Sequence, residues 1–561
     1  MHAEELTMFR TTQSLQISFE NRLLTMSEQT EKAIDASRAK LVGDVIYPNV
    51  DEEKFSGLFS EVFSRPNITI SRYVSALVLK RMYRLSDEVF IEFLRCGALN
   101  FQYALHTTQE EKQPLSESSL RRFRRKIEAY LEETGHDLIQ EEFERISKMM
   151  AVDMGLLGKD PSDGEGDNAP ILVRMDSMEI EAHAKAMTRI EILYMTNVVM
   201  IRYLLKKEYG ELLPQELLHY LESDDHNKVM YYKASEDKKA GVQDTRVSAA
   251  VQEMVLLQRV MTENFTQKFL SGIPEYVVFQ RVLEEQTYLN DEGQRVPKDK
   301  KDISPDSVQN PFDATVTYRY KRGQHHGHVL NVAEVVDDHG NGIITYAQIE
   351  PNTTADNTMA EDYVRQLPDD GAKTILSADG AYSSDELKKL AEEKNVEVRN
   401  TALTGKTPDD IFADFILNED GTAVLSCPAG NVPDACHFNP ATGRITATMP
   451  CNCCANCPNK DKCNAKIGIR KHVSRVQITS KTVERAKQSK ECSTEEGKKN
   501  ARRRNGVEGI MSVLRRKYDL DHIPVFGLNR LKIWVWTSLL SYNLVKYLRY
   551  RQILDKQPLT A

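Results

Sequence analysis

The chain has 561 residues, of which 40% are hydrophobic, so it is long enough for two to four domains and can bury a core. Its net charge of −9 averages over separate acidic and basic segments, and no apolar run reaches the length of a membrane span, which excludes a protein built on membrane-spanning helices. The first residues lack the basic start and apolar stretch of a secretory signal, so we expect a cytoplasmic, nucleoid-associated protein.

The first part of the chain is expected to be helical. Residues 1–50 form a polar N-terminal extension, and residues 51–154 place apolar side chains at three- and four-residue spacings, which is typical of helices that share a core. Serines near position 116 precede a predicted helix with a basic exposed face. Its cations are Arg121, Arg122, Arg124, Arg125 and Lys126. Such a face suits phosphate contacts, and we predict a DNA-binding domain over residues 51–154; the alternative is a solvated face around a buried Phe123.

A Gly- and Asp-rich segment, residues 155–170, is predicted to be a linker. The short apolar run that follows, residues 171–177, indicates a strand that ends near Asp176. Residues 178–306 then have few glycines and a helical pattern, so we expect a helical insertion after this first strand.

Residues 307–404 alternate between strand and helix patterns. The turn at residues 337–342 indicates a hairpin between two strands. A further apolar run, residues 374–378, is followed by Asp379, at the kind of strand end where open sheets bind ligands. The predicted order is a strand, a helical insertion, two or three antiparallel strands, and then alternating helices and strands. This order is typical of a ribonuclease-H-like α/β core, with Asp176 and Asp379 at the ends of neighbouring strands.

Nine cysteines are present, and seven of them lie between residues 427 and 463. This clustering favours thiolate ligands of a metal over disulfides, and we predict a Cys-rich insertion over residues 405–478. The two-residue gap between Cys454 and Cys457 allows both thiolates to face one ion. With Cys427 and Cys463 they could form a Cys₄ zinc site. The alternatives are other ligands, Cys436, Cys451 or Cys453, or reduced thiols without metal.

The C-terminal segment, residues 479–561, is predicted to hold catalytic and core helices. Val507, Met511 and Leu514 share one stripe of a helix, which puts Glu508 at the edge of its buried face. Arg504 stands one turn before Glu508 and Arg515 two turns after it. Taken alone, such a carboxylate is more simply explained by an ordinary ion pair one turn away.

Three carboxylates that converge on one place repel one another unless cations lie between them. Two Mg²⁺ or Mn²⁺ ions about 4 Å apart would relieve this repulsion and would activate a water or a DNA 3′-hydroxyl for attack on a phosphodiester. We therefore predict that Asp176, Asp379 and Glu508 are catalytic metal ligands. The substrate would be a nucleic-acid backbone, held by arginines that include Arg504 and Arg515.

Several of these stretches resemble one known family. They are residues 116–125, 174–177, 310–314, 377–382, 427–430 and 504–515, followed by Gly527 and Leu528. The chain resembles DDE transposases of bacterial insertion sequences, the group with a helical N-terminal domain, a ribonuclease-H-like core and a cysteine-bearing insert. The resemblance covers roughly residues 50 to 550.

The resemblance implies cleavage of DNA at the ends of an insertion sequence, joining to target DNA, and a homodimer on paired ends. Related transposases carry a Tyr-x2-Arg-x3-Glu-x6-Lys pattern around the third carboxylate. Arg504 and Glu508 match it, Arg515 stands in the lysine place, and Ala501 replaces the tyrosine. Two alternatives remain open, namely an inactive transposase-derived DNA-binding protein and a nuclease of the same fold without strand transfer.

Overall fold

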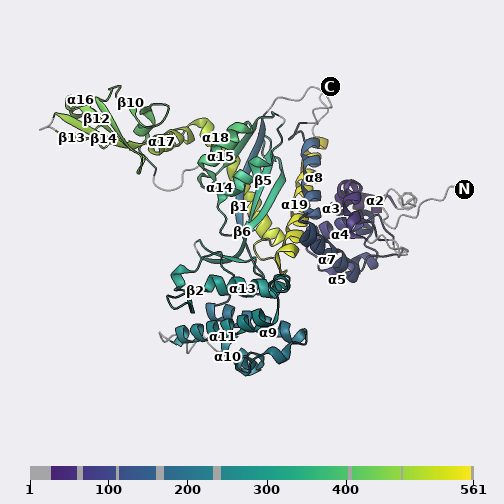
Figure 1. Ribbon diagram of the computed structural model, residues 1–561. Coiled ribbons are helices and arrows are strands. Elements are labelled where there is room, and N and C mark those ends of the chain that lie inside the picture. Colours follow the sequence, from purple (N-terminus) through teal and green to yellow (C-terminus); the bar gives the residue numbers. More distant parts are fainter. Residues whose placement is uncertain are drawn as a thin grey trace.

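The structure is a computed structural model. It describes residues 27–59, 67–108, 113–158, 170–230, 242–321, 323–369, 371–401, 407–468 and 472–556. The protein is mixed α/β, with a helical N-terminal region and a core built around a sheet (Figure 1). To this extent the predicted fold class is confirmed. Much of the predicted N-terminal extension and most of the predicted linker lie outside the described residues.

The N-terminal region is a bundle of short helices around one buried helix. The helices are α2 (Glu28–Asp35), α3 (Arg38–Leu41), α4 (Ile70–Tyr83), α5 (Asp87–Arg95), α6 (Leu99–Ala104), α7 (Glu117–Thr134) and α8 (Leu138–Asp153). Helix α4 is buried along most of its length, and its Tyr73 ring stacks on Phe123 of α7 at 4.4 Å between centroids. Phe123 is therefore a core residue of this bundle, as the alternative of a solvated face around a buried Phe123 expects.

The central sheet has six strands. They are β1 (Ile171–Glu181), β4 (Thr317–Tyr320), β5 (Gln324–Val336), β6 (Gly342–Pro351), β7 (Thr374–Ala378) and β8 (Val396–Asn400). Their order is β4-β5-β1-β7-β8, with β6 paired to β5. Strand β1 runs parallel to β7 and antiparallel to β5. The predicted hairpin is confirmed as β5 and β6, and α14 (Asp356–Arg365) and α15 (Asp385–Glu393) follow as predicted.

One prediction about this sheet is wrong. Strand β1 does not end near Asp176 but continues to Glu181, because it stays paired with the long strand β5 as far as Gly327. Pairing with β7 stops earlier, at Arg174. Asp176 therefore lies inside β1, two residues beyond the point where its pairing with β7 ends.

The region between β1 and β4 is largely helical and has its own hydrophobic core. It contains α9 (Arg189–Lys206), α10 (Ser223–Met230), α11 (Val242–Asn264), α12 (Gln267–Leu270) and α13 (Pro274–Gln286). A small hairpin, β2 (Thr287–Leu289) with β3 (Arg295–Pro297), adds strands that the sequence pattern did not indicate.

The cysteine-bearing region also has its own core and extends away from the central sheet (Figure 1). Its strands are β9 (Ile416–Leu417), β10 (Val424–Ser426), β11 (Ala435–Asn439), β12 (Arg444–Pro450), β13 (Lys466–Gly468) and β14 (Val473–Thr479), with α16 (Cys451–Ala455) between β12 and β13. Helix α17 (Ser480–Cys492) leads back toward the sheet.

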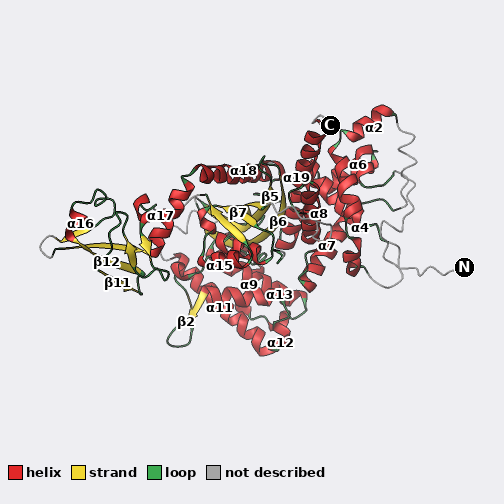
Figure 2. Cartoon of the chain, turned by 90° about the horizontal axis from the view of Figure 1, so that it is seen from above, coloured by secondary structure: helices red, strands yellow, loops and turns green. Residues whose placement is uncertain are grey.

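The last two helices connect the sheet to the N-terminal region. Helix α18 (Glu495–Tyr518) packs across β1 and β7 (Figure 2). Helix α19 (Leu528–Lys556) packs against α4, α8 and β6, so one hydrophobic core runs from the N-terminal helices through the sheet. Within the described residues, no helix is both long and apolar enough to cross a bilayer.

Candidate active site

The first candidate residue, Asp176, reaches the site from the middle of β1. Alternation along the strand buries Met175 and leaves Asp176 partly accessible, with 16% of its side chain exposed. The backbone N–H of Ser177 donates to Asp176 Oδ1 at 3.0 Å, which helps to hold the carboxylate in one orientation.

The second candidate, Asp379, directly follows the buried strand β7. Its Oδ1 accepts a hydrogen bond from the backbone N–H of Ala381 at 2.8 Å, so it caps the short 3₁₀ turn Gly380–Tyr382. Ser384 then caps α15 by accepting from the N–H of Leu387 at 2.9 Å. The strand and the two caps together fix where the Asp379 carboxylate leaves the sheet.

The third candidate, Glu508, lies on α18. The stripe of Val507, Met511 and Leu514 is buried as predicted, and it turns Glu508 toward solvent, with 64% of its side chain exposed. Arg504, one turn earlier on the same helix, is only 13% exposed and points into the space between the helix and the sheet.

A single guanidinium contacts all three carboxylates. Arg504 Nη2 lies 3.0 Å from Asp176 Oδ2 and 3.8 Å from Asp379 Oδ2, and Arg504 Nη1 lies 3.0 Å from Glu508 Oε1. Asp176 Oδ2 and Asp379 Oδ2 therefore lie near each other, because both contact the same nitrogen, Arg504 Nη2. The structure brings the three sequence-predicted carboxylates together from β1, the end of β7 and α18.

The electrostatics of this cluster reflect crowding of negative charge. Burial raises the pKa of the Asp176 carboxyl above its ordinary value, Arg504 opposes that shift, and the charges of Asp379 and Asp356 add to it. Asp356, at the start of α14, is a fourth carboxylate near the site, and its Oδ1 accepts from Ser177 Oγ at 2.8 Å. The sequence does not single out Asp356, because an aspartate in the first turn of a helix is common and carries no distinguishing signal.

A buried ion pair fixes α18 against the sheet. Arg174 of β1 pairs with the fully buried Glu334 of β5, and its Nη1 donates to the backbone carbonyl of Arg503 at 2.9 Å. Lys546 of α19 also contacts Glu334, at 2.8 Å. Gly506 leaves room for this arrangement, because a Cβ there would lie 1.9 Å from Arg174 Nη1. Arg174 thus sets the height of Arg504 and Glu508 above the sheet.

Within the described residues, no group of three or more His, Cys, Asp or Glu side chains is arranged to hold a metal ion. At the carboxylate cluster the reason is visible, because the guanidinium of Arg504 occupies the position between the acids. The donor chemistry nevertheless fits a hard divalent cation, which prefers carboxylate oxygens. Asp176, Asp379 and Glu508 are the residues that would hold it.

All nine cysteines are free. The four predicted ligands, Cys427, Cys454, Cys457 and Cys463, line one small cavity of ≈ 20 Å³ together with Cys453, whereas Cys436 and Cys451 do not line it. Burial raises the pKa of the Cys454 and Cys463 thiols, and negative charge on neighbouring cysteines adds to the shift. The donor set fits zinc in chemistry, although no three of these thiols, among the residues that the structure describes, are arranged to hold a metal ion.

The predicted phosphate-binding arginines differ in their surroundings. Arg121, Arg122 and Arg125 are exposed on α7, and Arg515 is exposed on α18. Arg124 is not a freely solvated cation, because it forms an ion pair with Asp87 of α5 and is half-buried. The basic face of α7 is therefore partly engaged with the neighbouring helix.

Comparison with known proteins finds two family models that match separate parts of the chain. A family model described as a transposase DDE domain matches residues 426–548, and a second, described as transposase domain DUF772, matches residues 30–126. No curated protein and no solved structure gives a match. Both matching families are transposase domains, and a transposase implies a DNA substrate. More specifically, the two matches, which together cover less than half of the chain, support a DDE transposase of an insertion element.

Proposed function

We propose that this chain cleaves DNA at the ends of an insertion element and joins them to target DNA, using Asp176, Asp379 and Glu508 on a ribonuclease-H-like core. The observation that carries the proposal is the contact of Arg504 with all three carboxylates. These residues are far apart in the sequence, and three acids that share one cation form a place where divalent ions can bind.

Each residue of the site has a separate part in this proposal. The carboxylates would hold two divalent ions, which when bound supply an activated attacking oxygen and stabilise the leaving oxygen. Arg504, once the acids have other cations, is free to contact a DNA phosphate. Arg121, Arg122, Arg125 and Arg515 are exposed and add further phosphate contacts, and Arg124 does so from its ion pair at the edge of α7. The family resemblance further suggests a homodimer that acts on paired element ends.

The substitution Asp379→Asn tests the catalytic assignment. We expect it to lower DNA cleavage by about 10³-fold or more, because it removes a metal ligand, while duplex affinity changes little. The measurement is cleavage of an end-bearing duplex with Mg²⁺, beside duplex binding by fluorescence anisotropy. Lost binding with folding retained, or retained cleavage, would contradict the assignment.

Strand transfer separates a transposase from a nuclease of the same fold. The wild-type chain is incubated with Mg²⁺, an end-bearing duplex and a target plasmid, and covalent joint products are measured. Cleavage without any joined product would support hydrolysis alone. Neither cleavage nor joining, with DNA binding intact, would support a transposase-derived binding protein.

We also propose that Cys427, Cys454, Cys457 and Cys463 bind a structural zinc ion. Their shared cavity supports this, because the four cysteines that line it supply the donor atoms of a Cys₄ zinc site. Metal analysis of the purified chain should then find one zinc per chain, and a Cys457→Ala variant should lose it while the exposed Cys96→Ala control keeps it. Absence of bound zinc, with all thiols titratable, would reject the site.

A further inference from the structure

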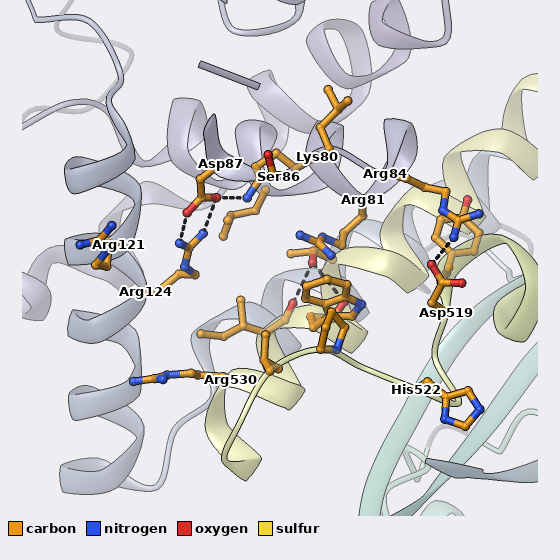
Figure 3. Close-up of a pocket in the computed structure, with 18 of the residues that line it drawn as sticks. Lys80, Arg81, Arg84, Ser86, Asp87, Arg121, Arg124, Asp519, His522 and Arg530 are labelled. Atoms are coloured by element: carbon orange, nitrogen blue, oxygen red, sulfur yellow. Dashed lines mark hydrogen bonds and ion pairs between the residues drawn. The ribbon is translucent and has the colours of Figure 1, made fainter. Parts of the chain in front are cut away.

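A large cavity lies between the N-terminal helices and the C-terminal segment, apart from the carboxylate cluster. It has a volume of ≈ 840 Å³ and is lined by α4, α5, α7 and residues 518–537 (Figure 3). One wall is the basic face of α7, and the opposite wall is the loop after α18 and the first turns of α19. The cavity is therefore built jointly by the two ends of the chain.

The charge of the lining is strongly positive. Seven Lys or Arg side chains face four Asp or Glu side chains. Most of these acids already have partners. Asp87 pairs with Lys80 and Arg124, and Asp519 pairs with Arg84 (Figure 3). Glu128 pairs with Arg530. The lining cations left without a paired carboxylate among the described residues are Arg81, Arg121 and Arg125.

Of these three cations, Arg81 is the one whose charge is partly shielded from water, since Arg121 and Arg125 are exposed. Its guanidinium carbon lies 3.3 Å from the ring centroid of Trp534, and no carboxylate in the described part of the chain pairs with it. Burial lowers the pKa of Arg81 to about 9, and the charge of Arg124 adds to the shift. The buried indole N–H of Trp534 has no hydrogen-bond acceptor in the described part of the chain. Both groups would be satisfied by an oxygen-rich anion in the cavity.

The position of the cavity indicates which anion fits. Asp519, at its edge, follows Glu508 by eleven residues along α18, which corresponds to about 16 Å at the rise of an α-helix. That distance is about five nucleotide steps along one strand of a duplex. Exposed Arg121 and Arg125 extend the positive surface from the cavity along α7. A polyanion running from the carboxylates to α7 would thus pass the cavity, whereas a small free anion would leave these exposed arginines unused.

We propose that this cavity binds a backbone phosphate of the DNA strand, several nucleotides from the bond at the carboxylates, with Arg81 and Trp534 as its ligands, while Arg121 at the far end of the cavity wall contacts another phosphate (Figure 3). The proposal rests on the proposed function, because it assumes DNA at the carboxylate cluster. It makes the N-terminal helices and α19 a single phosphate-binding element, and it assigns the half-buried Arg81 a contact that the sequence pattern did not indicate.

The test is binding of a labelled DNA duplex of mixed sequence to the full chain in EDTA, measured over a range of salt concentrations. Arg81→Gln should weaken binding about tenfold, because one charged hydrogen-bond donor is lost. The slope of log affinity against log salt should become shallower by about 0.9, the value for one phosphate. Arg121→Gln, on the exposed rim, should shift both quantities in the same direction and serves if Arg81→Gln does not fold.

The matched control is Arg259→Gln, an exposed arginine of α11 far along the chain from the cavity, which should leave both quantities unchanged. An unchanged slope in folded Arg81→Gln and in Arg121→Gln overturns the proposal. Inorganic phosphate and pyrophosphate form a second arm. If they raise the melting temperature of the wild type but not of Arg81→Gln, and duplex binding is unaffected, the cavity holds a small anion and the DNA assignment is overturned. Since no metal is present, the result does not depend on whether the chain cleaves DNA.

Discussion

Arg504 is the residue that joins the candidate active site, because its guanidinium contacts a carboxylate from each of three elements. The sequence predicts its contact with Glu508, since the two are one helical turn apart. The contacts with Asp176 and Asp379 could not be predicted in this way. They depend on the packing of α18 across the sheet.

The substitution Arg504→Gln tests this role. Without the guanidinium, the buried part of the acid cluster loses its cation, and we expect the unfolding free energy in EDTA to fall by about 1–3 kcal/mol. Mg²⁺ should then raise the melting temperature of the variant more than that of the wild type. Differential scanning fluorimetry with and without Mg²⁺ measures both effects.

Arg515→Gln is the matched control, because Arg515 is on the same helix but exposed. An equal Mg²⁺ response in Arg504→Gln, Arg515→Gln and the wild type would show that Arg504 does not share its position with a divalent ion.

At the scale of elements, the position of α18 depends on a glycine. Gly506 faces Arg174, and no side chain could replace its hydrogen without displacing either the helix or the ion pair of Arg174 with Glu334. The sequence pattern indicates the helix and its buried stripe correctly. It does not indicate why a residue with poor helix propensity occurs within it.

We expect alanine substitutions at two glycines of α18 to change stability in opposite directions. Gly506→Ala should destabilise the protein and lower DNA cleavage, because the new Cβ collides with Arg174 and shifts Arg504 and Glu508. Gly509→Ala meets nothing within 4 Å and should stabilise the protein by about 0.5–1 kcal/mol through helix propensity alone. Urea denaturation and cleavage rates measure both, and similar effects of the two variants would refute the proposed contact.

At the scale of the whole molecule, α19 holds the N-terminal helices and the sheet together. Asn543 donates to Ser147 Oγ of α8 at 2.9 Å and to the carbonyl of Ile344 in β6 at 2.8 Å, and its Oδ1 accepts from the Ile344 N–H at 3.1 Å. Trp536 Nε1 donates to Asp137 at 2.8 Å. Buried polar contacts between three distant segments specify how they pack.

Asn543→Ala should therefore lower the unfolding free energy by about 2–4 kcal/mol, because it leaves buried polar groups of α8 and β6 without partners. Asn529→Ala, which removes an amide from the exposed start of the same helix, should change it by about 0.5 kcal/mol or less. Chemical denaturation gives both values, and equal values would mean that the buried contacts of Asn543 do not hold the segments together.

The amino-acid sequence alone determined the local features of this protein: the strand before Asp379, the hairpin and the buried stripe of α18. These follow from periodicity and spacing, which act over a few residues. The sequence also pointed to Asp176, Asp379 and Glu508 as candidate metal ligands. The predicted end of β1 was wrong, because that end depends on pairing with β5, more than a hundred residues away.

Only the tertiary structure decided which charges meet. Arg504 lies among three carboxylates because Gly506 admits Arg174 beneath α18, and Arg81 lies in a cavity because α19 packs beside α4. The energy of a charge depends on its distance to others and on how far burial excludes water. Both are set by contacts between segments distant in sequence, which no local pattern records.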